Sequence, residues 1–127
     1  MKTSAPHCIS IEAAAEFVPA QSCPGEDHFA FVYHVTIRNT GTMAARLISR
    51  HWIVTDGAGR VQEIHGQGVV GEQPRLAPGE VFRYSCNCAL ETPVGTMQGS
   101  YLMETDDGRR FEAEIPAFVL AMPKTLH

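Results

Sequence analysis

One alternating segment, residues 29–39, constrains the fold more than any other stretch of the chain. Its odd-numbered positions as far as residue 37 all carry large apolar side chains: Phe29, Phe31, Tyr33, Val35 and Ile37. The positions between them are smaller or more polar on average. Successive side chains of a strand point to opposite faces, so this period of two indicates a strand with one buried face. An apolar face of this size has to pack on a second layer, which predicts a layered β-fold.

Shorter alternating segments lie on both sides of it. We expect strands over residues 8–18, 47–56, 60–65, 80–88, 97–104, 109–115 and 117–121, with turns rich in glycine, proline, asparagine and aspartate between them. Seven to eight short strands at intervals of about ten residues predict an all-β protein, an immunoglobulin-like or fibronectin type III-like antiparallel β-sandwich. Trp52, the only tryptophan, is expected in the core. Alternation places it on one face with Ile48 and Val54, opposite Leu47 and His51.

Length and composition set the broad class. A chain of 127 residues with 44% hydrophobic and 19% charged residues predicts one globular domain over 1–127. We expect an ordered core over about 7–121 and a frayed tail over 122–127. The formal charge of −4 gives no general attraction to nucleic acid, so no nucleic-acid partner is predicted. Since no apolar run has the length of a signal peptide or a membrane span, we expect a cytoplasmic protein without a membrane span.

Three segments carry a resemblance to a known family: SRHWIVTDGAGRVQEIHGQGVVGEQPRLAPGE (49–80), ETPVGTMQGSY (91–101) and FEAEIPAF (111–118). In these segments, and over nearly the whole chain, the sequence resembles the ApaG family. The resemblance implies a fibronectin type III-like sandwich, a role in protein interaction, and an association with cobalt resistance and magnesium efflux. The sequence departs from the family at Cys86-Asn87-Cys88-Ala89, where relatives carry a Ser-Gly-Cys-Pro-like turn. We expect Asn87 to preserve that turn, because asparagine tolerates positive φ.

The segment Gly66-x-Gly68-x-x-Gly71 matches the dinucleotide-binding fingerprint, in which a following helix presents its N-terminus to pyrophosphate. Prolines at positions 74 and 78 prevent such a helix, so a Rossmann site is excluded. Two interpretations stay open. The glycines form an ordered, irregular loop over 66–79 that needs unusual backbone angles, or successive amides of residues 66–71 bind a phosphate-containing ligand with help from His65 and Arg75.

The same loop contains two neighbouring valines, Val69 and Val70. They are either buried anchors of the loop or an exposed apolar tip. Only an exposed tip would mark a binding site for another protein.

The residues that could bind metal do not form a complete pattern. Cys86 and Cys88 are candidate ligands, together with the imidazoles of His34, His51 and His65. A C-x-C pair is narrower than the usual C-x2-C of structural zinc sites and no second pair follows, so no metal site and no cofactor are predicted. The carboxylates near Asp106-Asp107-Gly108 are more simply explained by a hairpin turn than by magnesium.

Catalysis has equally little support. Cys88 with His51 or His65 would form a thiol–imidazole pair, but nothing supplies an orienting carboxylate or an oxyanion hole. The sequence therefore predicts a non-catalytic binding module with unidentified protein partners. The alternative is a nucleotide- or pyrophosphate-binding protein that uses residues 66–71, with or without a hydrolytic step. The oligomeric state stays open, a homodimer included.

Overall fold

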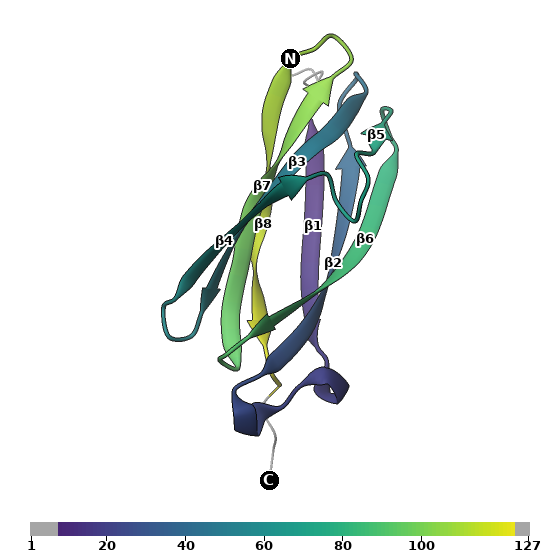
Figure 1. The fold of residues 1–127 in the computed structure, drawn as a ribbon. Coiled ribbons are helices and arrows are strands. Elements are labelled where there is room, and N and C mark those ends of the chain that lie inside the picture. The colour runs from purple at the N-terminus through teal and green to yellow at the C-terminus, as the bar shows by residue number, and fades with distance from the viewer. Residues whose placement is uncertain (1–7, 124–127) are drawn as a thin grey trace, which may run out of the picture.

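The computed structural model describes residues 8–123, and strands dominate it (Figure 1). In chain order the elements are β1 (Ile9–Phe17), the 3-10 turns η1 (Pro19–Gln21) and η2 (Pro24–Glu26), β2 (Phe29–Asn39), β3 (Ala45–Asp56), β4 (Val61–Gln67), β5 (Arg75–Leu76), β6 (Val81–Leu90), β7 (Val94–Thr105) and β8 (Arg110–Ala121). All strand pairs are antiparallel. The predicted all-β sandwich is confirmed. Within residues 8–123, no helix is both long and apolar enough to span a membrane.

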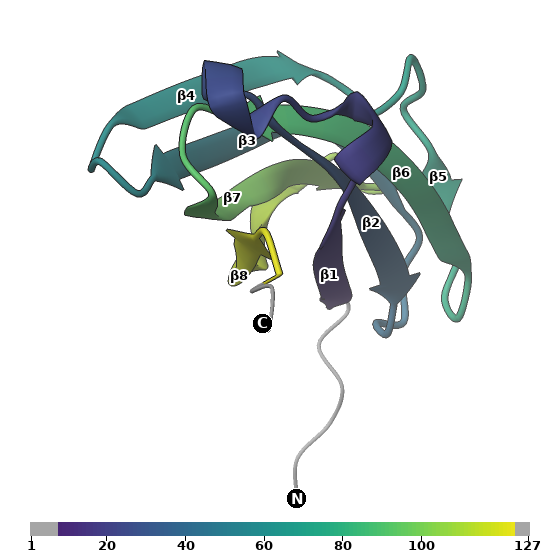
Figure 2. The same cartoon turned by 90° about the horizontal axis from the view of Figure 1, so that it is seen from below.

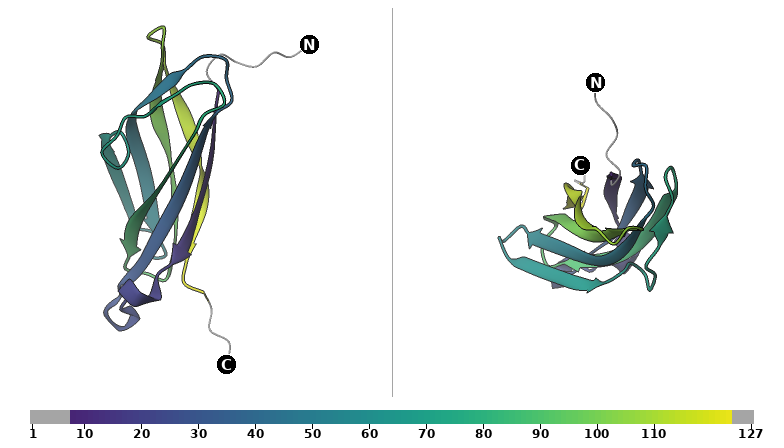
Figure 3. Two further views of the ribbon diagram at one scale, coloured as in Figure 1. Left: turned by 90° about the vertical axis from the view of Figure 1, so that its right-hand side faces the viewer. Right: turned by 90° about the horizontal axis from the view of Figure 1, so that it is seen from above.

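The strands form two sheets that face each other. One has three strands in the order β1-β2-β6, and the other has five, in the order β4-β3-β7-β8 with β5 paired to β3. The edge strands β1 and β8 lie side by side, and the sheets curve away from this seam around a common interior (Figures 2 and 3). We call the side of the five-stranded sheet that faces away from this interior its outer face.

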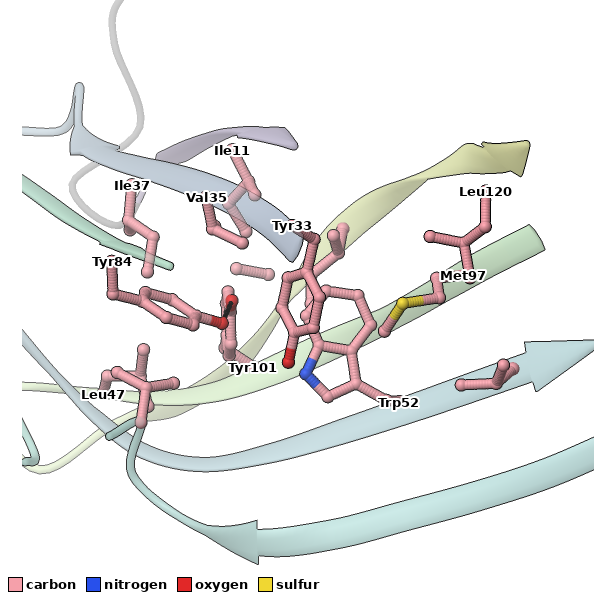
Figure 4. Packing of buried hydrophobic residues seen from close by; sticks show 14 of the residues in the cluster. Ile11, Tyr33, Val35, Ile37, Leu47, Trp52, Tyr84, Met97, Tyr101 and Leu120 are labelled. Atoms are coloured by element: carbon pink, nitrogen blue, oxygen red, sulfur yellow. Dashed lines mark hydrogen bonds between the residues drawn. The ribbon is translucent and has the colours of Figure 1, made fainter. Parts of the chain in front are cut away.

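The core confirms the alternation seen in the sequence. The odd-numbered side chains of β2 from Phe29 to Ile37 are 0–7% exposed. Trp52 on β3 is 1% exposed and lies beside Tyr33 and Tyr101 in the core (Figure 4). Three aromatic rings meet its indole edge-on, with centroids 5.3 Å (Tyr33), 5.9 Å (Phe118) and 6.4 Å (Tyr101) away. Edge-to-face pairs of this kind stabilise a core beyond the area that they bury. The expected place of Trp52 in the core is therefore correct.

The sequence placed Ile48 on the same face of β3 as Trp52 and Leu47 on the opposite face, and this prediction is wrong. The pairing of β3 with β7 shifts by one residue between Leu47 and Ser49, which inserts Ile48 as a bulge. As a result Leu47, at 0% exposure, joins the buried face with Trp52, while Ile48 is only partly buried. The Ile48 carbonyl faces the glycine-rich segment and accepts two hydrogen bonds from it, from the Gly68 amide and from Gln73 Nε2, both at 2.9 Å. The start of β3 thus helps to hold the glycine-rich segment.

Two further predictions about turns are corrected. The turn expected around Asn87 is missing, because β6 runs through residues 81–90 and pairs Asn87 with Val32 of β2. The expected break at Pro116 is also wrong: β8 is one strand, and a register shift against β7 between Met97 and Gly99 accommodates the proline, which has no N–H to donate.

Residue 122, the first of the predicted frayed tail, contacts the fold. Met122 donates its amide to the Pro93 carbonyl at 2.8 Å and packs on the core. Residues 124–127 of that predicted tail, and His7 at the start of the predicted core, lie outside the described residues.

Candidate functional site

The glycine-rich segment folds into a tight turn. Val69 and Glu72 exchange backbone hydrogen bonds of 2.8 and 2.9 Å, and the two residues between them, Val70 and Gly71, have φ of +44° and +81°. Positive φ at both central positions is the mark of the type I′ turn that closes β-hairpins. We call residues 66–73 the glycine hairpin. Its first two residues, Gly66 and Gln67, belong to β4 and not to an irregular loop as expected.

Close packing explains two of the glycines. Gly68 has φ +59°, and a Cβ there would lie 2.1 Å from the carbonyl oxygen of Glu72. A Cβ on Gly66 would lie 2.6 Å from the Arg50 guanidinium, which crosses above it. Arg50 Nη1 donates to the carbonyls of Gln67 at 3.0 Å and Gly68 at 2.9 Å. The hairpin is therefore held by side chains from β3, and Arg50 is a residue of this site that the sequence did not single out.

The two valines have different environments. Val69 is 1% exposed and part of the core, whereas Val70 is 53% exposed at the tip. Both interpretations made from the sequence are thus realised, one by each valine. Val70 is also strained, because a β-branched residue at positive φ is rare and costs about 1–3 kcal/mol.

The residues expected to help bind phosphate are engaged elsewhere. Arg75 forms two bonds to the Asp106 carboxylate, from Nε at 3.0 Å and from Nη2 at 2.5 Å, and hydrogen bonding to Arg75 lowers the pKa of Asp106. His65 stacks on His51 on the outer face of the sheet. Within residues 8–123, the amides of the turn that have no hydrogen-bond partner are those of Val70 and Gly71.

The outer face holds a cluster that the sequence prediction overlooked. Strand pairing places His51 directly opposite His65, and their rings stack at 4.2 Å with an angle of 8° between the planes. Glu63, two residues before His65 on the same face, accepts a hydrogen bond from His51 Nε2 at 2.8 Å. The sequence contained the information needed to find this pair. The Asp56–Arg60 turn sets the register of β3 against β4, with Thr55 opposite Val61. Four residues further from the turn on each strand, His51 lies opposite His65.

Cys86 and Cys88 lie on the other sheet and point inward. Cys86 and Cys88 share one face of β6, as alternation predicted, and both pack against the core. Burial, followed by the neighbouring Cys86, raises the pKa of Cys88 to about 11, so this thiol stays protonated near neutral pH. Since His51 and His65 lie on the outer face of the opposite sheet, the structure does not assemble a thiol–imidazole pair. All four cysteines are free.

The carboxylates around the turn at residues 105–109 are already paired. Glu104, Asp106 and Asp107 each bind an arginine, at 3.0 Å (Arg110), 2.5 Å (Arg75) and 3.5 Å (Arg109). In the interior, the hydroxyls of Tyr84 and Tyr101 bond to each other, and burial raises the pKa of Tyr84 to about 12. These tyrosines are therefore neutral at physiological pH and offer no phenolate.

Comparison with known proteins identifies the family. The ApaG domain model matches residues 19–105. Two relatives named Protein ApaG are similar over all of this chain and all of their own length, at 65% identity (Azoarcus sp. strain BH72) and 62% identity (Aromatoleum aromaticum). A crystal structure from Bordetella pertussis superposes with a TM-score of 0.93 at 49% identity, covering 97% of this chain and 100% of that one. This chain therefore belongs to the ApaG family.

Proposed function

We propose that this protein is a non-catalytic binding module and that its partner contacts the tip of the glycine hairpin. The observation that carries this proposal is Val70, an apolar side chain 53% exposed on a backbone with φ +44°. Glycine or asparagine would relieve that strain, so a valine there costs stability without adding to the core. Strain of this kind is concentrated at functional positions.

The rigidity of the hairpin supports the same proposal. Arg50 binds two of its carbonyls, the Gln73 side chain binds the Ile48 carbonyl, and Gly68 fits against Glu72. A surface that is already ordered loses little conformational entropy when a partner binds. Loops held by a rigid sandwich are also where such domains most often bind other molecules.

The family resemblance suggests the cellular process in which this binding takes place. The resemblance to the ApaG family implies an association with cobalt resistance and magnesium efflux. We propose that this chain acts in those processes by binding another protein at the glycine hairpin, and not by catalysing a reaction.

Substituting Val70 by asparagine tests the proposal. We expect Val70→Asn to recover at least tenfold less of the specific partner from a native cell extract. Its free energy of unfolding should equal or exceed that of the wild type by up to about 1 kcal/mol, because asparagine tolerates positive φ. Affinity capture followed by quantitative mass spectrometry measures the first effect, and urea denaturation measures the second.

Val61→Asn is the matched control, since Val61 is also a surface valine, 62% exposed on β4. It should recover the wild-type partners in full. Equal recovery by wild type and Val70→Asn would refute the proposed role of the tip.

A nucleotide- or pyrophosphate-binding role is the second candidate. It is favoured by the neighbouring amides of Val70 and Gly71, which have no hydrogen-bond partner among residues 8–123 and follow each other at positive φ. Successive amides of this kind can bind an anion. If they do, titration with pyrophosphate, ADP or diadenosine tetraphosphate will shift the backbone amide signals of residues 68–72 in NMR spectra, and sodium chloride at equal ionic strength will not. Unchanged signals would exclude this role.

A further inference from the structure

We propose that His51, Glu63 and His65 bind a divalent transition-metal ion, with zinc as the best fit, on the outer face of the five-stranded sheet. The proposed ligands are the Nε2 atoms of the two histidines and a carboxylate oxygen of Glu63. This site does not depend on the glycine hairpin or on its partner.

Strand pairing creates the cluster. His51 of β3 and His65 of β4 are directly opposite, so their side chains leave the sheet next to each other. Glu63 precedes His65 by two positions, which returns it to the same face. The rings are nearly parallel, 4.2 Å apart, and one ligand atom from each of the three residues lies within 4.8 Å of the others.

The distances suit an ion with short bonds. Glu63 Oε1 lies 2.8 Å from Nε2 of His51 and 3.9 Å from Nε2 of His65. Bonds of about 2.0–2.2 Å to zinc place neighbouring tetrahedral ligand atoms roughly 3.5 Å apart. To reach that arrangement both imidazole rings must turn out of their stacked orientation, because the lone pair of Nε2 lies in the ring plane and two parallel rings do not direct their lone pairs at one point. An ion between the three groups would replace the proton that His51 and Glu63 share.

The donor set selects the class of ion. Imidazole nitrogen suits zinc, cobalt, nickel and copper, whereas magnesium prefers oxygen ligands and retains its water. Two histidines and one glutamate supply three of the four ligands of a tetrahedral zinc site, which leaves one position for water or another small ligand.

There is room for that fourth ligand. A hollow of about 210 Å³ adjoins the two histidines, and its lining also includes Ser49, Arg50, Ser100, Leu102 and Glu112. The cluster itself is open to solvent: the side chains of His51, Glu63 and His65 are 32%, 56% and 69% exposed. An ion can therefore enter and leave without any opening of the fold.

The competing explanation is an ordinary surface ion pair, and the other sheet contains one for comparison. His34 Nε2 lies 3.1 Å from Glu16 Oε1, and Nδ1 of the same ring bonds to Ser85. Among the described residues, His51, Glu63 and His65 form a group of three potential ligands that lie close enough together to share one ion. His34 and Glu16 do not belong to such a group. The His34–Glu16 pair is thus a matched control within the same molecule.

The test uses the full chain and zinc alone. Calorimetric titration of the untagged protein with Zn²⁺ at pH 7.5, in the presence of a reductant that does not bind metal, should show one site per chain. Removing one ligand, as in His51→Gln, Glu63→Gln or His65→Gln, should weaken binding by more than about 100-fold, beyond the effect of losing an outer-shell contact. Co²⁺ in place of Zn²⁺ should give visible absorption bands of a four-coordinate ion, lost in the same variants.

Two controls separate this site from others. His34→Gln and the double variant Cys86→Ser/Cys88→Ser should bind Zn²⁺ as tightly as wild type. All of these variants change side chains that are at least partly exposed, and thermal melting should be used to check that each is folded. If the wild type binds no Zn²⁺, or if the three ligand variants bind it with unchanged affinity, the proposal is overturned. Loss of binding only in the cysteine variant would likewise overturn it and place the metal on the thiols.

Discussion

Replacing Trp52 with alanine should lower the free energy of unfolding by about 3–5 kcal/mol, the range for removing a buried aromatic side chain. Trp52 is 1% exposed and in contact with three aromatic rings, so the cavity would lie at the centre of the sandwich. The sheets on either side are held by hydrogen-bonded ladders and cannot collapse fully into the space. Urea denaturation followed by far-ultraviolet circular dichroism measures the loss.

Two other variants sharpen this prediction. Trp52→Phe should cost less than Trp52→Ala, because it preserves an aromatic ring and removes the indole N–H, a buried donor without a partner among the described residues. Val61→Ala, at a position 62% exposed, should change stability by less than about 0.5 kcal/mol. A loss below about 1 kcal/mol for Trp52→Ala would show that the sandwich is not organised around this side chain.

Replacing Gly68 with alanine should have the second large effect and lower the free energy of unfolding by about 2–5 kcal/mol. About 1–2 kcal/mol comes from holding a non-glycine residue at φ +59°. The rest comes from the new Cβ, which would lie 2.1 Å from the Glu72 carbonyl oxygen and must push the turn open. Opening the turn would also disturb the bond between the Gly68 amide and the Ile48 carbonyl.

Gly71→Ala is the control for this prediction, since it shares the conformational penalty without the close contact. Gly71 has φ +81°, and a Cβ there meets nothing within 4 Å. The free energy of unfolding of Gly71→Ala should therefore be only about 1–2 kcal/mol lower than that of the wild type. Equal losses for the two variants in urea denaturation would mean that the contact with Glu72 contributes nothing to the stability of the hairpin.

Much of the fold could be predicted from local sequence patterns. The period of two in residues 29–39 predicted the whole of β2 and its buried face, because alternation alone decides which side of a strand each side chain occupies. The turn at residues 56–60 also fixed the register of β3 against β4. The pairing of His51 with His65 could therefore be predicted from the sequence. Glu63 was overlooked because the cluster becomes apparent only when the residue pairs of the two strands are assigned one by one.

What the sequence by itself determined was the class of the fold, the buried face of β2, the core position of Trp52 and the exclusion of a helix after the glycines. Only the tertiary structure decided that Ile48 bulges out of the β7 ladder, that Val69 is buried while Val70 is exposed, and that Arg75 binds Asp106. The first group follows from neighbouring residues, whose side-chain direction and backbone freedom are set by local geometry. The second depends on partners distant in the chain, and those contacts exist only after the two sheets have packed together.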